Sequence, residues 1–164
     1  MKRAAALLIA LFTLSCAALP WQTAPIVPEK VSEGVYRGPH PDFGELAKVS
    51  IGAIISLEDD PAEIERERSG CLAMGMPFVS IPLSEYTAPT PEVLRKIVEQ
   101  IQLWRQENVY VHCRRGIDRT GYAIAAYRII VEDWSFDRAY AEVLAHGHSE
   151  FFYGVWKRSL EDLQ

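Results

Sequence analysis

A run of ten residues in the second half of the 164-residue chain combines one cysteine with three arginines and two glycines. Five residues separate Cys113 from Arg119, so a single turn of backbone could surround one tetrahedral oxyanion. A thiol in such a place is expected to ionise, because arginines and helix N-termini stabilise thiolates. These residue types and this spacing predict nucleophilic attack by Cys113 on phosphorus. The run reads His112-Cys113-Arg114-Arg115-Gly116-Ile117-Asp118-Arg119-Thr120-Gly121.

The segments on either side of this run determine how it would be held. Residues 108–112 are β-branched and aromatic, which is typical of a buried strand, and residues 122–129 have the apolar pattern of a helix. A strand, a glycine-bearing loop and a helix N-terminus form an anion site, because successive N–H groups and the positive end of the helix dipole converge. The sequence therefore predicts a phosphate site at Cys113 and Arg119.

The ten residues resemble the His-Cys-five-residues-Arg-Thr/Ser signature of the protein tyrosine phosphatase superfamily, especially its small dual-specificity branch. The resemblance extends loosely from about Val31 to the end of the chain. It implies a cysteinyl-phosphate on Cys113, a phosphate held by Arg119, a leaving thiolate steadied by Thr120, and no cofactor or metal ion. The other loop residues would surround the phosphate or shape the loop. They are His112, which orients the loop, Gly116 and Gly121, where a side chain would crowd the loop or the helix start, and the variable positions Arg114, Arg115, Ile117 and Asp118.

Cleavage of a phosphate ester also needs an acid that protonates the leaving oxygen. In the family an aspartate on a separate loop before the cysteine does this, but residues 83–92 contain no aspartate. This segment resembles the Thr-Asp-His-x-x-Pro loop of the phosphatase-like phytases, with Ser84, Glu85, Tyr86 and Pro89 at the matching places. The resemblance implies that Glu85 is the acid and that Tyr86 either stacks on a substrate ring or packs the loop.

Asp118 is the alternative to Glu85, because it lies inside the loop next to Arg119. It could donate a proton, act as a base that positions water, or only shape the loop. Arg114 and Arg115 suit a substrate with several phosphates, since each guanidinium can bind another phosphate in a fork. We expect one of these two arginines to point to solvent or to pair with Glu85 or Asp118.

Further polar residues follow the predicted strands. Glu58, Asp59 and Asp60 come after a predicted strand and are interpreted as a solvated turn and a helix cap. Arg37 and His40 follow the first strand, where they either reach the same edge of the sheet or form a surface turn.

The two remaining groups of possible ligands are interpreted as structural. His146 and His148 have a spacing that can bind a metal, but a loop between two helices without a nearby acidic partner is favoured. Cys71 could form a redox bridge with Cys113, but a small core residue on a helix is the preferred interpretation.

The N-terminal residues have the pattern of a leader. A short basic start, an apolar run over residues 4–14 and small residues around Cys16 are typical of a bacterial secretory signal, and the run is too short to span a membrane. Residues 14–16 resemble a lipoprotein processing box, so lipidation of Cys16 and ordinary cleavage near Ala17 or Ala18 stay open. We expect residues 1–18 to be the leader, residues 19–30 a linker, and the protein to be periplasmic or an outer-membrane lipoprotein.

The charge of the chain limits its partners. Removing residues 1–15 takes away Lys2 and Arg3 and no acidic residue, so the formal net charge changes from −5 to −7. A net acidic protein is not a general binder of nucleic acid, and any positive potential must be local. We expect a monomer that acts on a phosphorylated small molecule or a phosphoprotein.

Predicted strands and helices alternate over residues 31–164, which favours a single α/β domain with a mainly parallel sheet flanked by helices, like that of dual-specificity phosphatases. The segments after the strands should meet at one edge of the sheet, where ligands bind in such folds. The expected strands are 34–39, at an edge, 51–57, 77–83 and 108–112. The expected helices are 42–49, 61–74, 90–104, the one after the loop, 136–145 and 150–163.

These observations together predict a cysteine-dependent phosphatase outside the cytoplasm. The paired loop arginines and the phytase-like acid loop favour inositol polyphosphates, such as inositol hexakisphosphate, as substrates. A protein tyrosine or dual-specificity phosphatase is the alternative. A catalytically weak phosphate-binding module is a more remote one.

Overall fold

The centre of the computed structural model, which describes residues 27–150 and 154–164, is a five-stranded sheet. The strand order is β1-β2-β5-β3-β4, and every pairing is parallel except the antiparallel one between β1 and β2. The single α/β domain with a mainly parallel sheet is therefore confirmed. The strands are β1 (Glu29–Ser32), β2 (Val35–Gly38), β3 (Ala53–Ser56), β4 (Phe78–Ser80) and β5 (Val109–His112).

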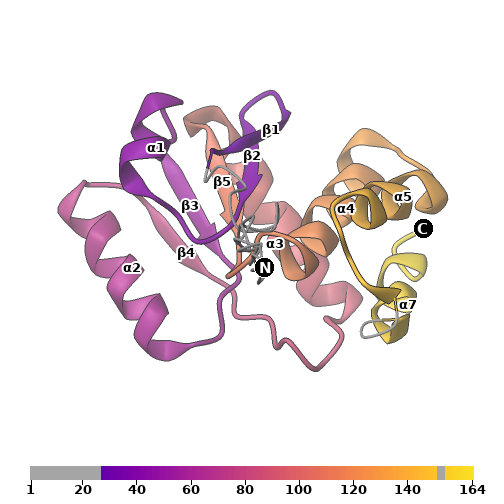
Figure 1. Cartoon of the computed structure of the whole chain (residues 1–164). Coiled ribbons are helices and arrows are strands. Elements are labelled where there is room, and N and C mark those ends of the chain that lie inside the picture. Colours follow the sequence, from indigo (N-terminus) through magenta and orange to yellow (C-terminus); the bar gives the residue numbers. More distant parts are fainter. Residues whose placement is uncertain (1–26, 151–153) are drawn as a thin grey trace, which may run out of the picture.

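Helices cover both faces of the sheet, as Figure 1 shows. On one face lie α1 (Phe43–Lys48) and α2 (Pro61–Ala73), and beyond the other lie α3 (Pro91–Trp104), α4 (Asp118–Glu132), α5 (Phe136–Ala145) and α7 (Lys157–Glu161). Short 3₁₀ turns occur at Arg105–Glu107 and Gly154–Trp156. Within the described residues, no helix is long and apolar enough to cross a membrane.

The alternation of side chains along the strands divides the core into two clusters. Ile54 of β3 and Tyr110 of β5 belong to the cluster under α1 and α2, whereas Ile55 and Val111 belong to the larger cluster under α3 and α4. Because both faces of β3 and β5 are buried, these strands are apolar up to their last residues, Ser56 and His112, which is the pattern that the sequence shows.

Three helices begin at side chains that the sequence indicated. Asp42 and Asp60 accept hydrogen bonds from the first backbone N–H groups of α1 and α2, and the Thr90 hydroxyl accepts from Val93 N in α3. Such caps satisfy N–H groups that have no partner within the helix. The caps therefore fix where each helix starts after its strand.

Two elements differ from the prediction. Glu29 and Lys30, predicted as part of an extended linker, begin β1, so β2 has a neighbour on each side and β1 is the edge strand. The exposed residues of β1 carry no hydrophobic alternation, because an edge strand is held largely through its backbone. The predicted helix over residues 150–163 is, in its described part, a 3₁₀ turn followed by the short α7.

Candidate active site

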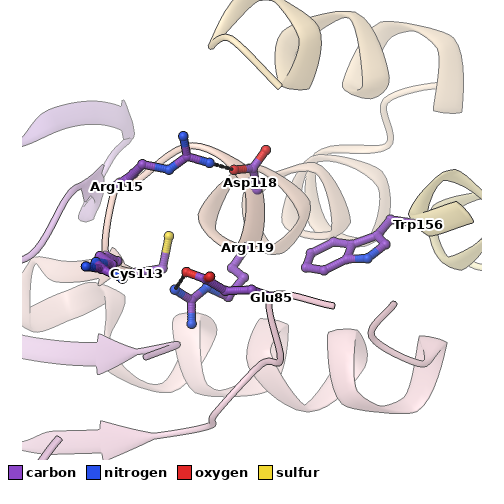
Figure 2. Close-up of a pocket in the computed structure, with 7 residues that line it drawn as sticks. Glu85, Cys113, Arg115, Asp118, Arg119 and Trp156 are labelled. Atoms are coloured by element: carbon purple, nitrogen blue, oxygen red, sulfur yellow. Dashed lines mark hydrogen bonds and ion pairs between the residues drawn. The ribbon is translucent and has the colours of Figure 1, made fainter. Parts of the chain in front are cut away.

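The ten-residue run connects the carboxyl end of β5 to the start of α4, as its flanking patterns predicted. Cys113 and Arg119 expose 3% of their surface each and line one pocket (Figure 2). Arg119 lies in the first turn of α4, where the positive end of the helix dipole favours anions. The remaining residues around this pocket are Glu85, Arg114, Arg115, Asp118 and Trp156.

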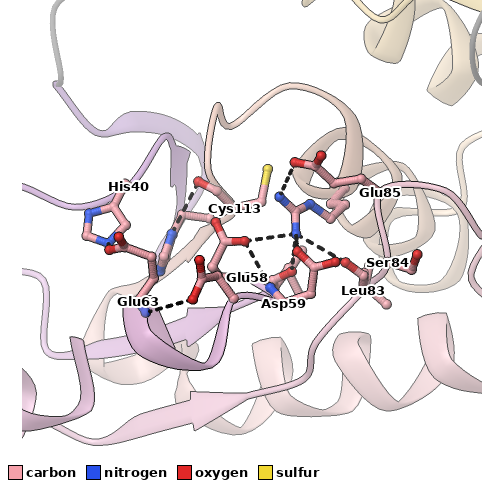
Figure 3. Close-up of polar contacts among 12 residues, drawn as sticks. His40, Glu58, Asp59, Glu63, Leu83, Ser84, Glu85 and Cys113 are labelled. Atoms are coloured by element: carbon pink, nitrogen blue, oxygen red, sulfur yellow. Dashed lines mark hydrogen bonds and ion pairs between the residues drawn. The ribbon is translucent and has the colours of Figure 1, made fainter. Parts of the chain in front are cut away.

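The guanidinium of Arg119 connects the segments that follow β3 and β4. Figure 3 labels its partners Glu58, Asp59, Leu83 and Glu85. Burial alone would lower the pKa of Arg119, but the negative charges of Cys113 and the surrounding carboxylates raise it. The cation is therefore firmly held at the edge of the sheet. Its Nη1 lies 3.2 Å from Leu57 O, 3.2 Å from Glu58 Oε1, 2.7 Å from Asp59 Oδ1 and 3.1 Å from Leu83 O, and its Nη2 lies 3.0 Å from Glu85 Oε1.

The acidic segment after β3 is only partly the solvated turn that the sequence indicated. Glu58 is buried, with 3% of its surface exposed, and both it and Asp59 pair with Arg119. A buried guanidinium needs compensating charge, which explains why Glu58 turns inward and why Asp59, although exposed, also faces Arg119. Asp60 is the helix cap that was predicted, since its Oδ1 accepts from Ala62 N at 2.8 Å. The contacts with Arg119 depend on β3 lying next to β5 in the sheet, which the sequence pattern does not reveal.

Arg37 and His40 reach the loop from β2 and the segment after it. Arg37 is buried beneath the loop, where its Nη2 donates to Gly116 O at 2.9 Å, and burial lowers the pKa of its guanidinium. The backbone N–H of His40 donates to Arg114 O at 3.3 Å. Both residues therefore contact the loop, and Arg37 does not lie in a surface turn.

The two glycines of the run differ in what they require. Gly116 has a φ of +70°, and a Cβ there would collide with the backbone of Gly38, so the expected crowding is confirmed. Gly121 lies inside α4, and a Cβ at this position would have Val143 Cγ1 as its nearest neighbour at 3.5 Å, an ordinary contact. The expectation that a side chain at Gly121 would crowd the helix start is wrong.

His112 lies beneath the loop and pairs with a carboxylate of α2. Its Nε2 is 2.5 Å from Glu67 Oε1 of α2, and both side chains are fully buried. Its Nδ1 lies 3.4 Å from the carbonyl oxygen of Cys113. The sequence pattern did not identify Glu67, because a single acid in a strongly charged helix has no distinguishing feature.

Asp118 accepts hydrogen bonds at both of its oxygens. Arg115 Nη2 lies 2.7 Å from Oδ2, which confirms that one loop arginine pairs with this carboxylate. His148 Nδ1 lies 2.9 Å from Oδ1. His146 in turn pairs with Glu29 at 3.0 Å, so both histidines have acidic partners, contrary to the expectation. Residues 27–150 and 154–164 contain no group of three or more side chains that could hold a metal ion.

The remaining predicted residues surround the pocket at different depths. Glu85 projects from the segment between β4 and α3 with about a third of its side chain exposed, at 35%, whereas Tyr86 is 90% exposed and does not line the pocket. Ile117 is half-buried just before α4. The buried Thr120 Oγ1 has no hydrogen-bond partner in the described part of the chain.

Cys71 is a buried residue of α2, as predicted, and belongs to the cluster on the opposite face of the sheet from Cys113. Burial, with a further contribution from the charge of Glu67, raises the pKa of its thiol to about 11. Both cysteines are free thiols. Because thiolates and not thiols are nucleophiles, Cys71 is unsuited to react at neutral pH.

Comparisons with known sequences agree with this geometry. The family model described as "Polymorphic toxin system, DSP-PTPase phosphatase" matches residues 32–133, which include β2 to β5, the loop and α4. The mRNA-capping enzyme of Danio rerio is 32% identical over 104 residues, which are 57% of this chain and 16% of that enzyme. The dual specificity protein phosphatase TpbA of Pseudomonas aeruginosa is 27% identical over 126 residues. These are 74% of this chain and 55% of TpbA, so the chain spans only about half the length of that relative.

Solved structures share the fold. A mutant form of Tk-PTP superposes with a TM-score of 0.71 at 23% identity, over 84% of this chain and 93% of that one. The core catalytic domain of the PP-IP phosphatase SIW14 from S. cerevisiae gives 0.70 at 18% identity, over 84% and 85%. TpbA of P. aeruginosa in complex with pTyr gives 0.65 at 19% identity, over 85% and 94%. The strand–loop–helix arrangement is therefore part of a shared fold.

The two loop glycines allow a paired test of the loop geometry. We expect Gly116→Ala to lower the free energy of unfolding by about 1–3 kcal/mol, because it combines a left-handed backbone with a backbone collision. Gly121→Ala should change it by no more than about 1 kcal/mol, since alanine favours a helix. Urea denaturation of both variants and the wild type measures this. Equal stability of the two variants would contradict this loop conformation.

Proposed function

The chain belongs to the DSP-PTPase phosphatase family, and from this premise we propose that it hydrolyses phosphomonoesters through a phosphate bound covalently to Cys113. One observation carries the proposal. The thiol of Cys113 and the guanidinium of Arg119 are buried in the same pocket, and the carboxylate of Glu85 is held there by the same guanidinium. A nucleophile, an anion-binding cation and an acid thus share one site.

In the proposed first step, the Cys113 thiolate attacks phosphorus while Arg119 binds two of the phosphate oxygens. The ester bond to phosphorus breaks, and its oxygen takes the proton of Glu85 as the alcohol leaves. Water then attacks the cysteinyl-phosphate, the bond between sulfur and phosphorus breaks, and inorganic phosphate and the thiolate are released. The hydroxyl of Thr120, which has no hydrogen-bond partner among the described residues, is available to donate a hydrogen bond to that thiolate.

Two differences in environment favour Glu85 over Asp118 as the acid. Glu85 pairs with Arg119, whose guanidinium must turn to the phosphate when substrate binds, so its carboxyl group becomes available to the leaving oxygen. Asp118 is held at both oxygens by Arg115 and His148, so binding of a phosphate at Arg119 does not release it to follow a leaving group. Two carboxyl groups in one site can take the separate roles of acid and base when their surroundings differ in this way.

We propose inositol polyphosphates as the substrate class. Arg114 and Arg115 are exposed at the mouth of the pocket, and Arg114 also lines an adjoining cavity, where its guanidinium could bind a second phosphate. The likeness to SIW14, named as a PP-IP phosphatase, supports this proposal.

Phosphotyrosine is the second candidate, and specific features favour it. Trp156 lines the pocket, and its indole could form an apolar wall against the aromatic ring of a phosphotyrosine substrate. The adjoining cavity carries three carboxylates, Glu58, Asp60 and Glu63, which would repel additional phosphates. The structure of TpbA in complex with pTyr is consistent with this alternative.

We also propose that the chain is exported by its N-terminal leader. The apolar run and Cys16 lie in residues 1–26, outside the described residues, so the proposal depends on the sequence pattern alone. The intact mass of protein purified from the cell envelope tests it. A mature N-terminus at Cys16, or just after Ala17 or Ala18, is expected, and a chain that retains Met1 would contradict export.

A comparison of two substrates tests the substrate class. We expect the wild type to release phosphate faster from inositol hexakisphosphate than from a phosphotyrosine peptide. Arg114→Ala should lower kcat/KM for the inositol phosphate about tenfold, since a charged hydrogen bond contributes about 1.5–3 kcal/mol. Cys113→Ser should abolish both activities and serves as the control for the covalent mechanism. Faster turnover of the peptide, unaffected by Arg114→Ala, would assign the enzyme to phosphotyrosine.

The leaving group tests the acid. Glu85→Gln should lower kcat about 10²–10⁴-fold on an alkyl phosphate, because an alkoxide cannot leave without a proton. The same variant should lose far less on 4-nitrophenyl phosphate, since nitrophenolate leaves unprotonated. Asp118→Asn should show losses of similar size on both substrates. A leaving-group dependence confined to Asp118→Asn would make Asp118 the acid in place of Glu85.

A further inference from the structure

His148 lies in the segment after α5 and connects that segment to the loop. Its side chain is fully buried, and its Nδ1 is 2.9 Å from Asp118 Oδ1. Asp118 in turn lines the pocket that contains Cys113 (Figure 2). A histidine that is distant in sequence thus holds a carboxylate at the site.

The surroundings of His148 favour one tautomer of its ring. The carboxylate of Asp118 can only accept a hydrogen bond, so the Nδ1 that faces it carries the hydrogen. The hydroxyl of Tyr122 lies 3.5 Å from Nε2 on the other side of the ring. Tyr140, which donates to Glu150, packs edge-on against the same imidazole ring. The imidazole is therefore fixed both by packing and by its polar contacts.

Asp118 accepts hydrogen bonds from two side chains that differ in mobility. Arg115 approaches Oδ2 from the solvent side with 62% of its side chain exposed, whereas His148 approaches Oδ1 from the interior. A long exposed side chain loses entropy when it is held in one position, so it positions a partner weakly. The buried His148 is the contact that can set the orientation of the Asp118 carboxylate.

We propose that His148 is a positioning residue that orients Asp118 as the base for the second chemical step. This inference rests on the proposed cysteinyl-phosphate mechanism. Water lies between Asp118 and the phosphorus of the intermediate, and its proton passes to the Asp118 carboxylate. The water oxygen forms its bond to phosphorus as the sulfur–phosphorus bond breaks, and the electron pair of that bond returns to Cys113 as the thiolate. The proton then leaves Asp118 for solvent.

Asp118 has room for this role with both of its partners in place. A carboxylate has about four acceptor positions on its two oxygens, and Arg115 and His148 occupy two of them. The division of work with Glu85 follows, because Glu85 protonates a leaving group that differs among substrates, whereas Asp118 activates a water that every substrate shares.

The experiment compares His148→Asn with His148→Gln in rapid-quench measurements on 4-nitrophenyl phosphate. In asparagine the amide nitrogen is attached to Cγ, as Nδ1 is in histidine, so this variant can still donate to Asp118. In glutamine the amide lies one bond further out and misses that position. His146→Gln is the matched control, because His146 pairs with Glu29 and lies outside the pocket.

We expect His148→Gln to lower kcat about tenfold and to accumulate phosphoenzyme at Cys113, with a nitrophenol burst approaching one per enzyme. His148→Asn and His146→Gln should turn over like the wild type. Equal losses in both His148 variants without accumulation of phosphoenzyme, or no loss in either, would overturn the proposal. Asp118→Asn should also accumulate phosphoenzyme, and its failure to do so overturns the proposal even if a His148 variant does not fold.

The same measurements separate this proposal from the one it rests on. If mass spectrometry finds no phosphate on Cys113 in any variant, the covalent mechanism itself is wrong. If phosphoenzyme forms in the wild type and its decay is unaffected by His148→Gln and Asp118→Asn, only the positioning role is wrong.

Discussion

The buried guanidinium of Arg119 is the constraint on which the site depends. A charge in the interior is tolerated only where acceptors surround it, and here they come from the segments after β3 and β4. These segments lie side by side because parallel strands bring their carboxyl ends to the same edge of the sheet. The loop after β5, the acidic segment after β3 and the segment after β4 that carries Glu85 thus have fixed relative positions.

The same contacts determine which carboxylate a bound phosphate must replace at Arg119. Glu58, Asp59 and Glu85 together carry more formal negative charge than the guanidinium neutralises, so a phosphate dianion enters against repulsion unless some of these carboxylates move. Glu58 is the most deeply buried of them and the least able to move. Asp59 and Glu85 each expose about a third of their side chains, but of these two only Glu85 lines the pocket that contains Cys113. In the proposed mechanism, a phosphate in that pocket therefore displaces Glu85 first, which couples binding of substrate to release of the proposed acid through one cation.

The sequence predicted the features that are local in the chain and missed those that are not. The strand before Cys113, the helix after it and the caps at Asp42 and Asp60 follow from patterns within a few residues. The inward turn of Glu58 and the burial of Arg37 depend on which strands are neighbours, and hydropathy carries no information about that order. The edge strand β1 was missed because its exposed residues have no alternation.

The pairing of His148 with Asp118 shows how burial can divide roles between two similar carboxyl groups. Glu85 and Asp118 line the same pocket, but Glu85 pairs with Arg119, whereas Asp118 is held by Arg115 and His148. In the proposed mechanism, the phosphate takes the place of Glu85 at Arg119, and Asp118 keeps both of these partners. An acid must follow leaving groups of different shape, whereas a base for water needs a fixed geometry. In the proposed mechanism, the contact of the buried His148 with Asp118 therefore suits Asp118 to the role that tolerates least movement.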